Sequence, residues 1–292
     1  MLAMTYGAAA LLGIIEGLTE YLPVSSTGHL LVAQRALGLG ADDGASRDAA
    51  EAFAICIQAG AILAVLGLYR ARAAAMCRGL LGHDPAGLRL FLCLVAGLLP
   101  AVVIGLLFEK KIKRWLFGGG ELGLWPIVGA WIVGGIAILI IERWRRRPAT
   151  HADQDANDDT GLELEQMNWK QGFVIGLVQC LAMWPGVSRS LTTILGGVTC
   201  GLRTSAAVEF SFLLGVLTLG GATAKDGLEH GSLMLEVYGA GPLLVGTLTA
   251  TLAAVVAMKW MIQYLKRHGL EIFGVYRIVL GIAVAAWLLT GR

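Results

Sequence analysis

The chain has 292 residues, of which 56% are apolar and only 15% are charged, and its mean hydropathy is +0.69. Soluble globular domains have about 45–50% apolar and about 25% charged residues, so this composition excludes an ordinary soluble domain and predicts a membrane protein. The formal net charge of +2 excludes the strongly basic surface of a nucleic-acid-binding protein.

Ten apolar segments follow one another along the chain. A hydrocarbon core of about 30 Å needs roughly 20 helical residues, and six segments satisfy this within boundary error: 52–69, 88–108, 122–141, 207–224, 239–262 and 272–290. The other four are shorter: 2–20, 29–39, 171–183 and 190–200. They form two pairs, each divided by a turn rich in Pro, Gly, Ser or Thr. Such pairs predict re-entrant hairpins, which enter the membrane and leave on the same side.

The order short, short, long, long, long occurs twice. It predicts an all-α polytopic membrane protein, a single membrane domain built as an inverted-topology repeat, because three crossings in each half turn the second half over. Residues 1–147 would form the first repeat, 148–169 a cytoplasmic linker and 170–292 the second repeat. Residues 17–20 (Gly-Leu-Thr-Glu) parallel residues 176–179 (Gly-Leu-Val-Gln). Chance similarity between apolar segments is the alternative.

The distribution of Lys and Arg predicts the orientation of the chain. They are more frequent on the side that holds the loops at 70–89 and 142–170, although a basic cluster at 110–114 lies on the other side. By the positive-inside rule the richer side is cytoplasmic, and both termini lie outside. The acidic stretch 153–159 is interpreted as a solvated part of the linker.

The first hairpin carries two carboxylates. Glu16 and Glu20 are four residues apart, so both project from one face of a helix. Ionisable groups at membrane depth are costly and need a cation, a shared proton or a water-filled cavity. A hard divalent ion completed by substrate phosphates would meet this need. The alternative is that this segment emerges at the membrane interface, where glutamates cost little.

The turn of the first hairpin supplies hydroxyls and an imidazole. Ser25, Ser26 or Thr27 could act as a nucleophile, and His29 could act as a base or proton donor. A Ser/Thr-rich turn also caps helices, here a helix that opens from His29. The two functions are compatible, because the free N–H groups of a helix start attract anions.

The second hairpin places one arginine among hydroxyls. Arg189 is flanked by Ser188 and Ser190, and a guanidinium with neighbouring hydroxyl donors suits a phosphate oxyanion. Gly186 would let the backbone approach a ligand closely. The alternative is a structural ion pair between Arg189 and one of the two glutamates.

These motifs resemble the signatures of the bacterial undecaprenyl-diphosphatase family of the bacitracin-resistance type. The first is the glutamate pair with Pro-Val-Ser-Ser-Thr-Gly-His (23–29), and the second runs from Gln179 through Pro-Gly-Val-Ser-Arg-Ser (185–190) to Thr193. Further similarity lies at 53–65, 99–108, 209–214 and 276–277, so the resemblance covers nearly the whole chain. In one departure, Ala54 stands where the family has a glutamate; Glu51 is the nearest substitute.

The resemblance implies hydrolysis of undecaprenyl diphosphate to undecaprenyl phosphate and inorganic phosphate. This reaction recycles the lipid carrier of peptidoglycan synthesis and confers bacitracin resistance. It implies a multi-pass protein of the bacterial cytoplasmic (inner) membrane, a site open to the outer, periplasmic side, and a divalent metal, Mg²⁺ or Ca²⁺. A homodimer is a candidate assembly.

The resemblance also assigns roles to matching positions. The expected catalytic residues are Glu20, Ser26, His29 and Arg189. The expected metal ligands are Glu16 and Glu20. The expected substrate-binding residues are Ser25, Thr27, Gly186, Ser188, Ser190 and Thr193.

The working hypothesis is that Ser26 attacks the terminal phosphorus while His29 or Glu20 handles the proton. Ser25, a phosphohistidine at His29 and direct attack by water remain alternatives. The rival function is a transporter or flippase of a prenyl phosphate lipid, because inverted repeats with broken helices also support alternating access. A nucleophile beside a base favours an enzyme, since binding alone does not require that pair.

Overall fold

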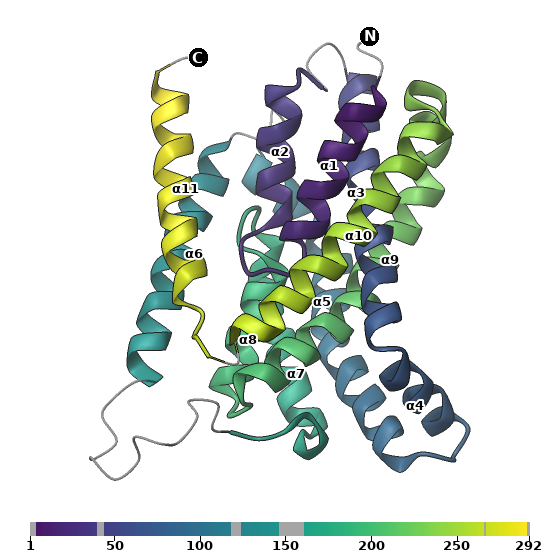
Figure 1. Cartoon of the computed structure of the whole chain (residues 1–292), viewed down its shortest axis with the longest axis vertical. Coiled ribbons are helices and arrows are strands. Elements are labelled where there is room, and N and C mark those ends of the chain that lie inside the picture. The colour runs from purple at the N-terminus through teal and green to yellow at the C-terminus, as the bar shows by residue number, and fades with distance from the viewer. Residues whose placement is uncertain (1–3, 40–43, 118–123, 146–160, 266, 291–292) are drawn as a thin grey trace. The chain divides into compact units, whose positions relative to one another are not determined.

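The structure is a computed structural model and describes residues 4–39, 44–117, 124–145, 161–265 and 267–290. Within these ranges the chain is helical and contains no β-strand, which confirms the predicted all-α class (Figure 1). The elements are α1 (Tyr6–Thr19), α2 (Ser26–Ala36), α3 (Gly44–Leu68), α4 (Arg70–Leu80), α5 (Pro85–Phe117), α6 (Leu124–Arg145), the short 3-10 helix η1 (Leu164–Gln166), α7 (Trp169–Gln179), the 3-10 helix η2 (Cys180–Met183), α8 (Arg189–Thr199), α9 (Thr204–Tyr238), α10 (Ala240–Leu265) and α11 (Glu271–Leu289).

Among the described residues, six helices are long and apolar enough to cross a membrane. The candidate spans are Ala49–Leu68, Pro85–Leu107, Leu124–Trp144, Thr204–Glu229, Ala240–Leu265 and Glu271–Leu289. Each overlaps one of the six long apolar segments predicted from the sequence. The four short segments correspond to α1, α2, α7 with η2, and α8, whose α-helices have 14, 11, 11 and 11 residues. At about 1.5 Å per residue, none of these four reaches across a hydrocarbon core.

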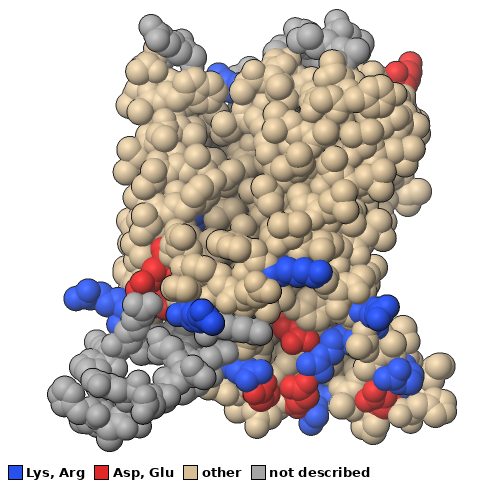
Figure 2. Space-filling view, viewed as in Figure 1, with Lys and Arg blue, Asp and Glu red and all other residues tan. Residues whose placement is uncertain are grey.

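The surfaces of the long helices are apolar. On α10, Leu244, Leu248, Leu252 and Val256 recur every four residues and are each 63–68% exposed. On the face shown in Figure 2, broad areas of helix surface carry neither Lys and Arg nor Asp and Glu. A continuous exposed apolar stripe of this kind is a liability in water and is stable against lipid.

The helices form two compact units by their contacts. Unit 1 consists of residues 1–22, 26–88 and 212–259, and unit 2 consists of 23–25, 89–211 and 260–292. Each unit therefore combines segments from both halves of the sequence, and residues 23–25 of the turn between α1 and α2 belong to unit 2. The division into repeats at 1–147 and 170–292 describes sequence order and stays a prediction.

Glycines bring backbones together in unit 1. A Cβ on Gly13 of α1 would overlap the Gly246 carbonyl oxygen of α10, and one on Gly17 would overlap the Ala250 carbonyl oxygen. Small residues at such crossings let apolar helices approach closely. The α1–α10 contact fixes the helix that carries both glutamates of the first hairpin.

Unit 2 contains two further close helix contacts at glycines. α6 and α11 lie side by side (Figure 1), and a Cβ on Gly135 would lie 2.6 Å from the Gly274 carbonyl oxygen. α7 packs on α5, where a Cβ on Gly172 would overlap the Cys93 carbonyl oxygen. The second of these contacts holds α7, the helix that precedes the second hairpin turn.

Several boundaries differ from those expected. The connection at 70–89, treated as a loop, contains α4, because its Ala, Arg, Met and Leu residues favour a helix even where the pattern is not apolar. α9 continues to Tyr238, beyond the predicted end at 224, because the polar residues after 224 end the apolar pattern without breaking the helix. The basic cluster at 110–114 is part of α5. The acidic stretch 153–159 lies outside the described residues.

Candidate functional site

The glutamates of the first hairpin lie at the end of α1. The side chain of Glu16 is fully buried and that of Glu20 is 6% exposed. Glu20 is the C-cap residue of α1, and its backbone N–H donates to the Glu16 carbonyl oxygen at 2.9 Å. Both side chains are therefore buried inside the protein, and their predicted functional role stays a prediction.

Ser26 is paired with one of these carboxylates. Its Oγ donates a hydrogen bond to Oε2 of Glu20, and both residues are buried. An anionic oxygen that accepts the hydroxyl proton increases the nucleophilicity of the hydroxyl oxygen. Ser26 is also the first residue of α2, so the helix begins at Ser26 and not at His29 as expected. Its hydroxyl therefore lies in the first helical turn, where N–H groups are free to bind an anion.

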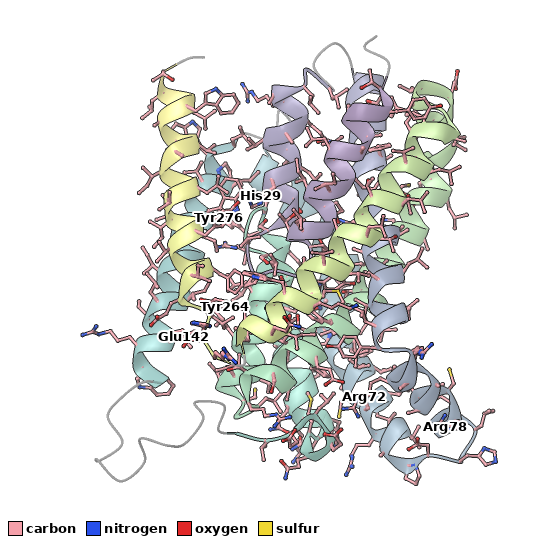
Figure 3. All side chains as sticks on the ribbon, viewed as in Figure 1. His29, Arg72, Arg78, Glu142, Tyr264 and Tyr276 are labelled. Carbon is pink, nitrogen blue, oxygen red and sulfur yellow. The ribbon has the colours of Figure 1, made fainter. Side chains whose placement is uncertain are left out.

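The remaining polar residues of this hairpin differ in exposure. His29 is half-buried and projects from α2 (Figure 3). It lies three residues after Ser26, which places the two side chains on neighbouring positions of one helix face. Thr27 is exposed, whereas Ser25 is buried and has a positive φ of 74°. A positive φ is uncommon for serine and marks a tightly constrained turn.

The second hairpin turn has a closely similar backbone feature. Ser188, the N-cap residue of α8, has a φ of 72°. Its Oγ accepts the Leu191 N–H at 3.3 Å and lies 3.0 Å from Oγ of Ser190. The positive-φ serine thus precedes the first residue of the following helix in both hairpins, before Ser26 in one and before Arg189 in the other.

Arg189 is held from α9. Its Nη1 donates to the Ser211 carbonyl oxygen at 2.8 Å. Thr193 is fully buried, and its Oγ1 lies 2.9 Å from the Arg189 carbonyl oxygen and 2.7 Å from Oγ of Ser211. Arg189 as a whole is half-buried. Thr193 therefore supports the backbone of Arg189, and its predicted contact with the substrate stays a prediction.

Gly186 also has a structural role that the sequence did not indicate. Its φ is 87°, and a Cβ there would lie 2.8 Å from Cα of Ile127 in α6. The close approach that this glycine permits is therefore to α6. The predicted approach of its backbone to a ligand stays a prediction.

The predicted site residues fall into two groups by contact unit. Unit 1 holds the residues of α1 and α2: Glu16, Glu20, Ser26, Thr27 and His29. Unit 2 holds the residues of the two turns and of α8: Ser25, Gly186, Ser188, Arg189, Ser190 and Thr193. The structure brings Ser26 to Glu20 in the first group, and Ser188 to Ser190 in the second.

Two polar residues of unit 2 had no assigned role. Arg277 on α11 is fully buried, and its position inside a long apolar segment was the available signal, since ionisable residues there are usually functional. Gln179, at the end of α7, is 4% exposed, and its Oε1 has no hydrogen-bond partner among the described residues. Its place in the repeat alignment, opposite Glu20, was the corresponding signal.

The donors near the first hairpin fit a divalent ion only in part. Among the described residues, no group of three or more His, Cys, Asp and Glu side chains could hold a metal. Glu16 and Glu20 supply two carboxylates from one helix face. Mg²⁺ is commonly held by one or two carboxylates together with water and substrate phosphates. The pair therefore suits an ion whose coordination the substrate completes.

Residues 9–283 match the family described as "Bacitracin resistance protein BacA". The chain belongs to this family. Among curated relatives, the chain is 45% identical over 281 residues to the "Undecaprenyl-diphosphatase" of Sorangium cellulosum, covering 96% of this chain and 85% of that protein. It is 41% identical over 283 residues to "Undecaprenyl-diphosphatase 2" of Rhodospirillum rubrum, covering 97% and 95%. It is 40% identical over 291 residues to the "Undecaprenyl-diphosphatase" of Cereibacter sphaeroides, covering the full length of both.

The family match includes both hairpins and every predicted site residue, from Glu16 to Thr193. It also includes Arg277 and α11 as far as residue 283. The family resemblance inferred from the hairpin motifs is thus confirmed. The matched residues also include the parts of unit 2 that contact the turns.

Proposed function

We propose that this chain hydrolyses undecaprenyl diphosphate to undecaprenyl phosphate and inorganic phosphate. The reaction recycles the lipid carrier of peptidoglycan synthesis and thereby confers bacitracin resistance. The hydrogen bond from Ser26 Oγ to Glu20 Oε2 carries the proposal, because it pairs a buried hydroxyl with a base at a helix start. The names of full-length relatives at 40–45% identity support the same reaction.

In the proposed mechanism Ser26 is the nucleophile. Its Oγ forms a bond to the terminal phosphorus, and the bond from that phosphorus to the bridging oxygen breaks. Undecaprenyl phosphate leaves with the electron pair, while Glu20 takes the hydroxyl proton. Water then attacks the phosphoserine, with His29 as the base. The bond from phosphorus to Ser26 Oγ breaks, Glu20 returns its proton to Oγ, and inorganic phosphate leaves. Ser25, His29 and an activated water are the alternative nucleophiles.

The second hairpin supplies positive charge and donors to the phosphoryl group. Arg189 forks onto its oxygens, and the hydroxyls of Ser188 and Ser190 add hydrogen bonds. The proposed substrate contacts also include Ser25, Thr27, Gly186 and Thr193. A divalent cation, Mg²⁺ or Ca²⁺, held by Glu16 and Glu20 would neutralise charge that develops on the transferred group.

The proposed cellular setting follows from the apolar spans and the distribution of basic residues. The chain is a multi-pass protein, and we place it in the bacterial cytoplasmic membrane with the site open to the periplasmic side. Both termini lie outside. A homodimer is the proposed assembly.

Phosphate release in detergent tests the proposal, since no transport can occur there. Purified protein should release inorganic phosphate from a prenyl diphosphate when Mg²⁺ or Ca²⁺ is present and should stop when the ion is chelated. Ser26→Ala and Arg189→Ala should abolish release. Arg203→Ala is the control, because Arg203 pairs with Glu163 outside the hairpin turns.

Two other results would decide against parts of the proposal. Full release by both site variants would contradict the site assignment. No release by the wild type, together with movement of a prenyl phosphate across liposomes, would favour the transporter.

A further inference from the structure

Arg277 is a buried cation inside a candidate membrane span. Its side chain is fully buried in unit 2. It donates to four backbone carbonyl oxygens: Nε to Trp131 at 3.4 Å, Nη1 to Pro23 at 3.2 Å, and Nη2 to Ala130 at 2.8 Å and Gly186 at 3.0 Å. A guanidinium at such a depth is costly unless its donors are satisfied. Here carbonyl oxygens accept from Nε, from Nη1 and twice from Nη2, four of the five N–H groups.

Two of these carbonyls occupy matching places in the two hairpin turns. Pro23 lies two residues before Ser25, and Gly186 lies two residues before Ser188. Ser25 and Ser188 are the non-glycine residues with positive φ among the described residues. Backbone in this region persists only where its surroundings hold it in place. One guanidinium therefore binds both strained turns at the same relative position, although they are far apart in the sequence.

A glycine on α6 leaves space for this guanidinium. A Cβ on Gly134 would lie 2.9 Å from Cζ of Arg277, so only glycine leaves room for it. α6 also contacts each turn directly. Nε1 of Trp131 donates to the Val24 carbonyl oxygen at 3.0 Å, and Nε1 of Trp184 donates to the Pro126 carbonyl oxygen at 3.3 Å. The α6–α11 pair thus forms a support for both turns.

We propose that Arg277 is a positioning residue for phosphoryl transfer, which sets the two hairpin turns in one fixed arrangement. By holding the Pro23 and Gly186 carbonyls, it fixes Ser25 and Ser188. Through the next peptide bond it fixes the backbone of Ser26 and Arg189. This inference rests on the proposed hydrolysis. Lysine cannot replace arginine here, because an ammonium lacks the planar fork that reaches both turns.

Kinetics of Arg277→Lys and Arg277→Ala test the inference. We expect kcat to fall about 100-fold with KM unchanged, since misplacing reacting groups by about 1 Å has an effect of that size. Added guanidinium ion should restore part of the kcat of Arg277→Ala. Arg203→Lys, an arginine of the same unit that pairs with Glu163, should behave as wild type. Wild-type kcat in both Arg277 variants would overturn the proposal.

Hydrogen exchange of the turn amides gives a readout that does not depend on hydrolysis. In Arg277→Lys, the amides of Val24 and Val187 should both exchange faster, because one guanidinium holds both turns. Unchanged exchange at either amide would contradict the inference that Arg277 holds both turns, even if the wild type proved inactive. An inactive wild type with the expected exchange would instead contradict the proposed function alone.

The thermal stability of the detergent-purified protein distinguishes the positioning role of Arg277 from a purely structural role. If guanidinium restored the melting temperature of Arg277→Ala and not its kcat, the positioning role would be wrong. If Arg277→Lys does not fold, Gly134→Ala provides the second variant, since it crowds the guanidinium and keeps its charge. It should lower kcat in the same direction and accelerate exchange at both amides.

Discussion

The two serines of the first turn are adjacent in sequence and different in structure. Ser26 opens α2 and donates to Glu20, whereas Ser25 is buried with its backbone in the left-handed region. The hydrogen bond gives Ser26 a base, and the positive φ gives Ser25 a role in shaping the turn. Nucleophile and turn-forming residue can therefore be separated by mutation.

Ser26→Ala should lower kcat by at least about 100-fold, because it removes the hydroxyl that the carboxylate activates. Rapid quenching of the wild type with a labelled prenyl diphosphate should trap phosphate on Ser26, and peptide mapping locates it. Label on His29 or Ser25 would assign the nucleophile to that residue. The absence of any phosphoenzyme would favour direct attack by water.

Ser25→Gly should keep most of the wild-type kcat and raise KM, because glycine adopts a positive φ without steric cost but lacks the hydroxyl proposed to contact the substrate. Ser25→Val should lose activity and thermal stability, because a β-branched residue is strongly disfavoured there. Comparing phosphate release and melting temperature of the two variants checks this. Equal loss in both would mean that the Ser25 hydroxyl, and not its backbone, is required.

At the scale of elements, the long apolar runs predicted all six candidate spans, because a bilayer-facing helix leaves a compositional signal over its whole length. The hairpin motifs also predicted which polar residues form the site, and that assignment stays a prediction. The sequence did not predict the partners of Arg277 or the support of Arg189 by Ser211, because these contacts join residues 22–254 positions apart. It also missed α4, whose residues favour a helix without an apolar pattern.

The α1–α10 contact can be tested by adding a single methyl group. Gly17→Ala should destabilise the protein by about 1–3 kcal/mol, because its Cβ would overlap the Ala250 carbonyl oxygen in the closely packed contact. Gly220→Ala in α9 is the matched control, since nothing lies within 4 Å of its Cβ position. There the gain in helix propensity should leave stability unchanged or raised. Thermal melting in detergent measures both, and equal melting temperatures would contradict the tight contact.

At the scale of the whole molecule, the remaining question is which end of each unit faces the cytoplasm. Basic residues predict that the region of α4 does, and Arg72 and Arg78 both project from this helix (Figure 3). An ion pair from Arg78 Nη2 to Asp84 Oδ2 at 3.5 Å, and the Gly87 N–H bonded to Asp84 Oδ1 at 2.9 Å, order the turn that follows. α4 thus ends in an ordered polar turn, as expected of a segment in water.

Cys77 makes this orientation testable with a native probe. It is an exposed free cysteine on α4, whereas Cys56, Cys93, Cys180 and Cys200 are partly or fully buried. A membrane-impermeant maleimide should therefore fail to label Cys77 in intact cells and should label it after permeabilisation. Cys77→Ser is the control and should remove the signal. Labelling in intact cells would place α4 outside. Each hairpin would then enter the membrane from the side opposite to the predicted one. The reason is that the predicted orientation of each span follows from that of its neighbours along the chain.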